Sequence, residues 1–436
     1  TIKSTSTDGK VTYNGSATNG GAKVTVTEPS TGYTIKYGKT EGTYNFDSIP
    51  TYTNAGTHTV YYKISAENYK DKTGKLNIVI NKKVAVVTTA PKAKDLTYNG
   101  STQALVTAGT TNNGTLQYSL DNKNWSTTIP TGTNAGTYDV YYKVVGDSNH
   151  SDSTPVKLTV TIARGTIIAS ATNGNATYTG NATSGGAKVT VNDPSSGYTI
   201  KYGTSSGGYN SATIPTFIDA GTHTVYYQIT APNYSTYNGR FDIIINKATA
   251  SITKVPTAKT LTYNGSAQAL VNAGTGTGGT FKYSTDNTNW STTIPSKTAA
   301  GAYTVYYKVI GDSNHNDSAI GSVKVTINTK AMKVTATNGS TTYTGTATNG
   351  GAKVTVTTPT SGYTVKYGTS SGSYTLNAIP TYVNAGSYTV YYQVTATNYT
   401  TFTGSLTITI STKAINISVT NGTAVYSGSA TNGGAK

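Results

Sequence analysis

The sequence predicts an all-β protein, a tandem array of small β-sandwich domains, and three observations lead to this fold class. Strings of residues recur at a fixed spacing along the 436-residue chain. Short runs rich in Val, Ile, Thr and Tyr alternate between apolar and polar positions, which is the pattern of half-buried strands. Asn-Gly, Gly-Gly and Ser-Gly pairs separate these runs, and they supply the positive φ that tight hairpins need.

Two kinds of repeat alternate along the chain. A string around Tyr13, here called type A, returns at Tyr178 and Tyr343, each time after 165 residues. A second string, type B, starts at Leu96 and returns at Leu261 after the same interval. The second half of both types contains Ile-Pro, then a short spacer, then Ala-Gly and Val-Tyr-Tyr. The predicted domains are 1–82 (type A), 83–163 (type B), 164–247 (type A), 248–329 (type B) and 330–412 (type A), followed by the first strands of a truncated type A domain at 413–436.

The first repeat shows how each unit forms its strands. Its runs predict strands at 23–27, 33–37, 58–65 and 76–80. In the third of these, Val60, Tyr62 and Ile64 share one face, which we expect to enter the core. Repeats of about 80 residues with about seven short strands fit a two-sheet sandwich. No sustained 3.6-residue apolar stripe is present, so we expect very little helix.

The tyrosine that precedes each core tyrosine of the Val-Tyr-Tyr motif points to the opposite face of its strand. These candidate exposed contact residues are Tyr61, Tyr141, Tyr226, Tyr306 and Tyr391. They have two interpretations. They can stack on sugar rings or meet a neighbouring molecule, or they can simply pack across strands and protect a sheet face.

The string Asn-Ala-Gly-Thr-Tyr-Asp-Val at 134–140 resembles the strand-F corner of the immunoglobulin fold, in which a tyrosine hydroxyl bonds back to the backbone. The resemblance implies a structural corner at Tyr138, Tyr303 and Tyr388. His58 and His223 occupy this position in the first two type A repeats, and a His there can still bond to the backbone. The core position two residues later is Val rather than Cys, so no disulfide joins the sheets.

As a whole, the chain resembles tandem bacterial immunoglobulin-like repeats (MBG-like repeats) of Gram-positive surface adhesins, on the Tyr-Asn-Gly, Ala-Gly-Thr and Val-Tyr-Tyr motifs of all its repeats. The resemblance implies an extended rod of immunoglobulin-like sandwiches. It also implies an extracellular protein of the cell surface or cell wall, and it assigns no catalytic residue.

Residue composition argues against most site chemistry. The chain contains no Cys, which excludes disulfides, thiolate metal sites and thiol catalysis. Repeat 330–412 has four Lys and no Asp, Glu or His, so no repeat-wide calcium site or acid–base catalysis is available. We therefore predict no enzyme, no cofactor and no metal. The stretch 121–124 faintly resembles a calcium loop but lacks its Gly and distal Glu, so a hairpin turn is predicted there, and 146–150 is predicted to be a hairpin tip.

The charge balance limits the partners. There are 33 Lys and Arg against 17 Asp and Glu, a net charge of +16 that is spread along the chain. A nucleic-acid reader usually concentrates Arg on one face, whereas only Arg164 and Arg240 are present, so no nucleic acid is expected. Diffuse Lys suits anionic wall polymers, acidic host glycans or simple solubility. No apolar stretch approaches 18 residues, so membrane insertion is not expected.

Only two or three residues separate the last strand of one repeat from the first strand of the next, which predicts a semi-rigid rod. Pairing of the first and last strands of each sandwich predicts substantial resistance to pulling. Residues 413–436 leave two alternatives open: either the chain continues, or these strands self-associate by completing a sandwich in another molecule.

Three functions follow from this pattern. The first is a structural stalk within a surface adhesin or extracellular fibre that projects a distal domain from the cell. The second is direct binding of glycan or mucin by the repeats. The third is a subunit of a self-assembling filament or surface layer.

Overall fold

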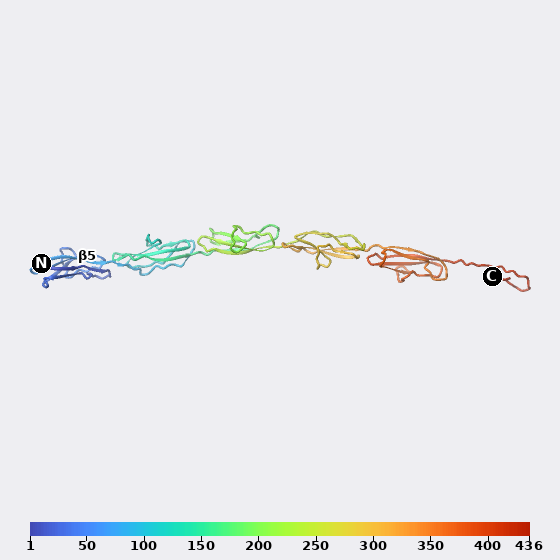
Figure 1. Cartoon of the computed structure of the whole chain (residues 1–436), viewed down its shortest axis with the longest axis horizontal. Coiled ribbons are helices and arrows are strands. Elements are labelled where there is room, and N and C mark those ends of the chain that lie inside the picture. Colours follow the sequence, from blue (N-terminus) through green and yellow to red (C-terminus); the bar gives the residue numbers. More distant parts are fainter. The chain divides into compact units, whose positions relative to one another are not determined.

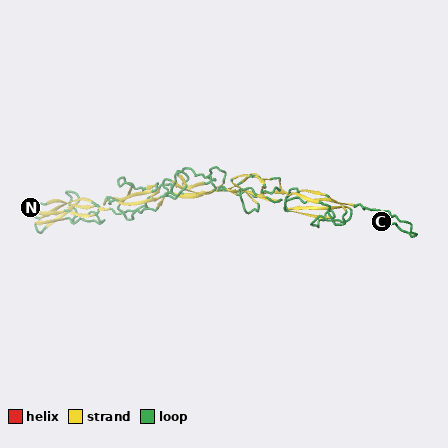
Figure 2. Cartoon of the chain, turned by 45° about the vertical axis from the view of Figure 1, so that its right-hand side comes forward, coloured by secondary structure: helices red, strands yellow, loops and turns green.

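The computed structural model describes all 436 residues, Thr1–Lys436. It consists of strands and loops without any helix, as Figure 2 shows, so the all-β prediction is confirmed. In Figure 1, coloured by residue number, each repeat folds from one continuous stretch of sequence. The chain divides into two compact units. Unit 1 is Thr1–Gly174, Ser184–Thr216 and His223–Ile243, and unit 2 is Asn175–Thr183, Phe217–Thr222 and Ile244–Lys436. The boundary between the two units passes through the third repeat. Each contact described below joins two residues of the same unit.

The strands follow the repeats. The first repeat contains β1 (Lys3–Thr7), β2 (Gly9–Thr12), β3 (Lys23–Glu28), β4 (Tyr33–Gly38), β5 (Gly56–Ala66) and β6 (Lys72–Asn81). The second contains β7 (Lys83–Val84), β8 (Leu96–Thr97), β9 (Gln103–Ala104), β10 (Gly114–Ser119), β11 (Thr131–Gly132), β12 (Gly136–Gly146), β13 (His150–Ser151) and β14 (Val156–Ala163). The third contains β15 (Ile168–Thr172), β16 (Gly174–Thr177), β17 (Lys188–Asp193), β18 (Thr199–Gly203), β19 (Gly221–Thr230) and β20 (Tyr237–Asn246).

The fourth repeat contains β21 (Ala248–Thr249), β22 (Ser251–Lys254), β23 (Thr257–Ala258), β24 (Leu261–Thr262), β25 (Gln268–Ala269), β26 (Val271–Asn272), β27 (Thr275–Thr277), β28 (Gly279–Ser284), β29 (Ser296–Lys297), β30 (Gly301–Gly311), β31 (His315–Asn316) and β32 (Gly321–Asn328). The fifth contains β33 (Lys333–Thr337), β34 (Gly339–Thr342), β35 (Lys353–Thr358), β36 (Tyr363–Gly368), β37 (Gly386–Ala396) and β38 (Phe402–Ser411).

Two sheets form the first sandwich. One has the strand order β2-β6-β5-β4, and the other is the antiparallel pair β1-β3. Strand β2 runs parallel to the last strand β6, with Gly9 opposite Ile78 and Thr12 opposite Asn81. In the fifth repeat, β34 pairs with β38 in the same way over four residues. The type B repeats make the same parallel pairing over only two residues, β8 with β14 and β24 with β32.

The core of each sandwich lies between its two sheets. In the first repeat, Val60, Tyr62 and Ile64 of β5 are between 0% and 5% exposed, on the face that the alternation predicts. The side chains that complete this core from β3 and β6 are Val24, Val26, Leu76, Ile78 and Ile80. Each sandwich therefore buries a modest core of its own, and comparable clusters occur in the second, fourth and fifth repeats.

A glycine lies opposite the core tyrosine in several sandwiches. Gly74 of β6 faces Tyr62 across the strands, and a Cβ at Gly74 would come within 2.4 Å of the tyrosine ring. The tyrosine ring therefore occupies the space that a larger residue on β6 would fill. Gly321 with Tyr307 and Gly404 with Tyr392 repeat this arrangement.

Residues 413–436 differ from the prediction. The structure contains no strand there, and Ile415, Ile417 and Val419 are 86%, 79% and 74% exposed. A backbone bond from Thr420 N to Lys436 O, 3.0 Å long, closes the segment on itself. The physical reason is that the segment carries only the first strands of a sandwich, which have no sheet to pair with and no core to cover.

Candidate functional site at the junctions between repeats

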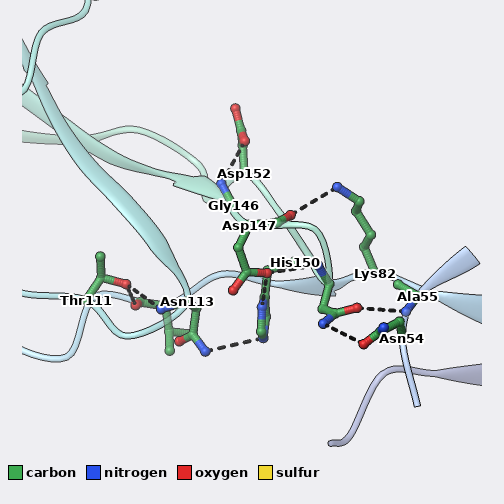
Figure 3. Close-up of polar contacts among 11 residues, drawn as sticks. Asn54, Ala55, Lys82, Thr111, Asn113, Gly146, Asp147, His150 and Asp152 are labelled. Atoms are coloured by element: carbon green, nitrogen blue, oxygen red, sulfur yellow. Dashed lines mark hydrogen bonds and ion pairs between the residues drawn. The ribbon is translucent and has the colours of Figure 1, made fainter.

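The first junction is made by a hairpin of the second repeat that reaches back to the first. We call residues 146–150, which lead from the end of β12 to the start of β13, the tip, and Asn54-Ala55-Gly56, at the start of β5, the corner. The tip Asn149 accepts a 2.8 Å hydrogen bond from the backbone N–H of Ala55 through its Oδ1. Its Nδ2 donates to Asn54 Oδ1 at 3.3 Å (Figure 3). One amide side chain thus bonds the backbone and the side chain of the neighbouring repeat.

The linker between the two repeats, Lys82-Lys83, adds a backbone and a side-chain contact to this junction. Lys83 N donates to Asn149 O at 3.2 Å, and β7 pairs in parallel with β13. Lys82 Nζ donates to the carbonyl of Asp147 at 3.1 Å (Figure 3). The two lysines that join the repeats are therefore bonded to the tip, which restricts the freedom of the linker.

His150 organises the inside of the tip. Its side chain is only 9% exposed, and its Nδ1 donates to Asp147 Oδ1 at 2.7 Å. Its Nε2 lies 3.3 Å from Asn113 Nδ2, and its ring meets Tyr13 of the first repeat edge-on at 5.2 Å between centroids. The hydrogen bond from His150, followed by the bond from Asn149 N, lowers the pKa of Asp147 from its ordinary value of 3.8. The carboxylate thus stays ionised and holds the tip in one shape.

The Asn–Ala bond recurs at all three other junctions. The tip asparagine Oδ1 accepts from the corner alanine N–H at 3.0 Å for Asn233 with Ala135, 2.7 Å for Asn314 with Ala220, and 2.7 Å for Asn398 with Ala300. Both repeat types therefore present the same hydrogen-bond acceptor to the preceding corner, although their tips differ in sequence.

The second bond of the tip asparagine depends on the first corner residue. Asn233 Nδ2 donates to Asn134 Oδ1 and Asn314 Nδ2 donates to Asp219 Oδ1, both at 3.1 Å. In the fourth repeat this corner position is Ala299, whose methyl group offers no acceptor. The junction between the fourth and fifth repeats therefore has one side-chain bond fewer.

At each junction a ring at the tip packs against a tyrosine of the preceding repeat, and the tip ring alternates between His and Tyr along the chain. His315 meets Tyr178 edge-on at 5.1 Å, as His150 meets Tyr13. At the tips of type A repeats a tyrosine takes this place, with Tyr234 against Tyr98 at 5.4 Å and Tyr399 against Tyr263 at 5.6 Å. Edge-on ring pairs are worth about 0.5–1.5 kcal/mol beyond burial. The junctions that enter type B repeats thus carry His, and those that enter type A repeats carry Tyr.

The predicted corner tyrosines lie directly beneath these contacts. The hydroxyl groups of Tyr138, Tyr303 and Tyr388 donate to the carbonyls of Asn134, Ala299 and Asn384 at 2.8, 2.8 and 2.9 Å. His58 makes the same bond to Asn54 O through Nε2 at 2.9 Å. In the first, second and fourth repeats, the residue that accepts this bond immediately precedes the alanine whose N–H meets the next tip. The corner tyrosine therefore fixes the loop that presents the N–H.

The outward tyrosines Tyr61, Tyr141, Tyr226, Tyr306 and Tyr391 are half-buried, on the face of their strands away from the core. Tyr61 borders a hollow of 150 Å³ with Tyr44, Glu41 and Lys75 among its lining residues. The five tyrosines belong to five different repeats, so the structure does not gather them into one site.

The stretch 121–124 is a turn, because Asp121 accepts bonds from Lys123 N at 2.9 Å and Asn124 N at 2.8 Å. These backbone and side-chain donors, those of Asn124 first, lower its pKa strongly. Both of its carboxylate oxygens are engaged within the loop. No group of three or more His, Asp or Glu side chains is arranged to hold a metal ion, and no helix is present that could cross a membrane.

The sequence predicts a hairpin tip at 146–150 but indicates no role for its asparagine. A signal was available: each of the four tips has Asn followed by His or Tyr, and the paired alanine lies 94 or 98 residues earlier. The spacing alone does not show that these residues meet, because that depends on where each sandwich ends.

No family model matches the chain, and no curated protein matches it. Among solved structures, Sidekick-1 immunoglobulin domains 1-5 is 12% identical, covers 94% of this chain and 99% of that chain, and has a TM-score of 0.24. The Protocadherin GammaB4 extracellular domain is 10% identical, covers 92% and 82%, and has a TM-score of 0.28. The human Desmocollin-1 ectodomain is 11% identical, covers 94% and 98%, and has a TM-score of 0.21. At such TM-scores we transfer neither function nor partners from these proteins.

Proposed function

We propose that this chain is the spacer of a bacterial cell-surface adhesin or extracellular fibre, a stalk that projects a distal domain from the cell. The observation that carries the proposal is the Asn–Ala hydrogen bond repeated at four junctions. A stalk needs successive domains held in a constant relation, and a repeated specific contact at every joint meets that need. The sequence resemblance to repeats of Gram-positive surface adhesins supports an extracellular, wall-attached location.

The domains of this spacer are the five repeats, with boundaries at 82/83, 163/164, 247/248, 329/330 and 412/413. The junction contacts support these boundaries, because β7 and β21 begin at the first residue after the boundaries 82/83 and 247/248. Each pairs with β13 or β31, next to the tip of its own repeat. The distributed lysines give the spacer a basic surface, which suits contact with anionic wall polymers.

Spin-label distances test the stalk proposal. The chain has no Cys, so Lys23→Cys with Thr115→Cys places one label in each of the first two repeats. We expect a narrow distance distribution that Asn149→Ala broadens, since this variant loses both side-chain bonds of the junction. Asn112→Ala, an exposed residue of the same repeat, is the matched control and leaves the distribution narrow. A wild-type distribution as broad as that of Asn149→Ala contradicts a spacer with fixed joints.

Glycan or mucin binding is the second candidate, and the hollow beside Tyr61 favours it. Two phenol rings, the carboxylate of Glu41 and the ammonium of Lys75 border this hollow of 150 Å³. Rings stack on sugar faces and the charged groups bond to hydroxyls. In the fifth repeat, Ser371 takes the position of Glu41, so Tyr391→Ala provides a control for Tyr61→Ala. Array binding to host glycans that Tyr61→Ala abolishes and Tyr391→Ala preserves supports this function, and an empty array argues against it.

A further inference from the structure

Nine Asn-Gly pairs occur in residues 1–412, and three of them occupy the same exposed turn in different repeats. Glycine has no side chain to shield its backbone nitrogen, so in an Asn-Gly pair this nitrogen can approach the preceding side-chain amide. Both residues of each turn pair are exposed. The three pairs, here called the turn pairs, are Asn14-Gly15, Asn99-Gly100 and Asn264-Gly265.

The turn leaves the glycine nitrogen of each turn pair free. None of these three N–H groups donates a hydrogen bond, and a Cβ at any of the three glycines would meet no atom within 4 Å. The asparagine Oδ1 instead accepts a hydrogen bond from the N–H two residues later, that of Ser16 at 2.9 Å, Ser101 at 3.0 Å and Ser266 at 2.9 Å. This donor polarises the side-chain carbonyl and stabilises negative charge that develops on its oxygen. The amide carbon Cγ is therefore open to attack by the neighbouring nitrogen.

Two other Asn-Gly pairs lie in turns, but their glycine nitrogen is engaged. In Asn19-Gly20 the glycine N–H donates to Thr18 Oγ1 at 2.9 Å, and in Asn349-Gly350 it donates to Thr348 Oγ1 at 3.0 Å. An attack by this nitrogen first has to break that hydrogen bond. These two pairs therefore have the same dipeptide sequence as the turn pairs but not the same freedom to react.

The remaining four pairs are restrained by strands. Asn173 Oδ1 accepts from Asp242 N in β20 at 3.0 Å, and Asn338 Oδ1 accepts from Thr407 N in β38 at 2.9 Å. The glycines that follow these two asparagines are buried. In the last two pairs the glycine belongs to a strand, Gly114 to β10 and Gly239 to β20. The fold thus restrains six of the nine pairs and leaves the three turn pairs free.

We propose that Asn14, Asn99 and Asn264 deamidate spontaneously, and that this modification loosens the junctions beside them. The glycine nitrogen forms a bond to Cγ, the bond from Cγ to Nδ2 breaks, and ammonia leaves with the proton of the glycine N–H. The product is a five-membered succinimide ring. Water then opens the ring at either carbonyl carbon. Opening at Cγ gives aspartate, and opening at the main-chain carbonyl gives isoaspartate, in which the backbone runs through the former side chain.

The position of the turn pairs connects this chemistry to the junctions. Each pair directly follows the tyrosine on which the next tip packs its ring, which is Tyr13, Tyr98 or Tyr263. Isoaspartate adds a methylene group to the backbone beside this tyrosine, and either product adds a negative charge. In the third repeat, Thr179 takes the position of Asn14, so Tyr178 has no reactive neighbour. The first, second and fourth junctions are therefore exposed to this modification, and the third is spared.

Peptide mapping by mass spectrometry tests the chemistry on the full chain after incubation at mildly alkaline pH in ¹⁸O-labelled water. We expect Asn14, Asn99 and Asn264 to deamidate with uptake of one labelled oxygen, at least about fivefold faster than Asn19 and Asn349, whose glycine nitrogen must first give up a hydrogen bond. In denaturant, the five sites should react at similar rates, because they share one dipeptide sequence. Equal rates in the folded chain, or no reaction at the three turn pairs, overturn the proposal.

Hydrogen exchange of the incubated protein tests the effect on the junctions. We expect the Ala55 amide, which bonds to the tip at the first junction, to exchange severalfold faster than in fresh protein. The Ala220 amide at the third junction should exchange as before. Asn14→Thr, which introduces the residue of the third repeat, is the matched control and should keep the exchange of Ala55 slow after incubation. Deamidation of Asn14 without faster exchange at Ala55, or an equal change at Ala220, overturns the effect on the junctions. The reaction at the turn pairs does not depend on the stalk function.

Discussion

Pulling the chain from its two ends loads each sandwich through its N-terminal strands and its last strand. In the type A repeats at either end of the chain, β2 and β34 run parallel to the last strands β6 and β38 and pair with them over four residues. In the two type B repeats, β8 and β24 pair with β14 and β32 in the same way over two residues. In parallel strands, the opposed forces act along the strand direction, so the ladder bonds bear the load together. A backbone bond also closes each pairing, such as Tyr13 N to Asn81 O at 2.8 Å and Tyr98 N to Ala163 O at 2.8 Å.

The difference in unfolding barrier between the two repeat types can be estimated from the number of hydrogen bonds in these parallel ladders. Two further residue pairs contribute about two hydrogen bonds, each worth about 1 kcal/mol net. A barrier about 2 kcal/mol higher slows unfolding under a given force by roughly 30-fold. We therefore expect two classes of unfolding event in single-molecule pulling, with the type A repeats unfolding at the higher force. Each event releases roughly 280 Å of extended chain for a repeat of about 80 residues.

Two proline substitutions in β2 test whether its hydrogen bonds to β6 bear the load. Tyr13 N–H bonds to β6 whereas Lys10 N–H bonds to Gly20 O on the other side. By the alternation along a parallel strand, the N–H of Val11 points at β6 and that of Thr12 points away. Val11→Pro should therefore lower the unfolding force of one event in the trace, and Thr12→Pro should lower it much less. A single force class for all repeats, or equal effects of the two prolines, refutes the shear mechanism.

Three further outcomes follow from the junctions and corners. Asn314→Ala should speed hydrogen exchange of the Ala220 amide about tenfold, because the amide loses a hydrogen bond worth about 1.4 kcal/mol. An unchanged exchange rate would contradict a stabilising role of this bond at the junction. Tyr388→Phe should lower the unfolding free energy of the fifth repeat by about 1 kcal/mol in denaturant titrations, while Tyr391→Phe changes it by less than about 0.5 kcal/mol. Because the pKa of Asp147 is lowered in the folded state, its stabilising effect is present above pH 3.8 and is lost as the pH falls below that value. Spin-label distributions across the first junction should therefore broaden in acid, and acid-insensitive distributions would contradict this role.

Much of each sandwich was predictable because its determinants are local. Alternation along 58–65 placed Val60, Tyr62 and Ile64 in the core, and the structure buries all three. The strand bounds were predicted within a few residues, with β5 and β6 extending further than the apolar pattern because polar residues continue the ladders. The corner bonds of Tyr138, Tyr303 and Tyr388 were expected from the resemblance to immunoglobulin domains, and His58 makes the same bond.

The junctions were not predictable in the same way. The sequence shows Asn149 only as a polar residue in a turn, and Ala55 only as a small residue before Gly56. Their contact joins residues 94 positions apart across two cores. It exists because both elements lie at the ends of their sandwiches that adjoin the linker.

By itself, the sequence determined the alternation of the two repeat types, the faces of their strands and the absence of thiol chemistry, because periodicity, turn residues and composition act locally. Only the tertiary structure decided that the tip asparagine meets the preceding corner and that the aromatic contacts of His and Tyr alternate at the joints. These features depend on where the ends of separately folded sandwiches come together, and no local pattern of residues encodes that position.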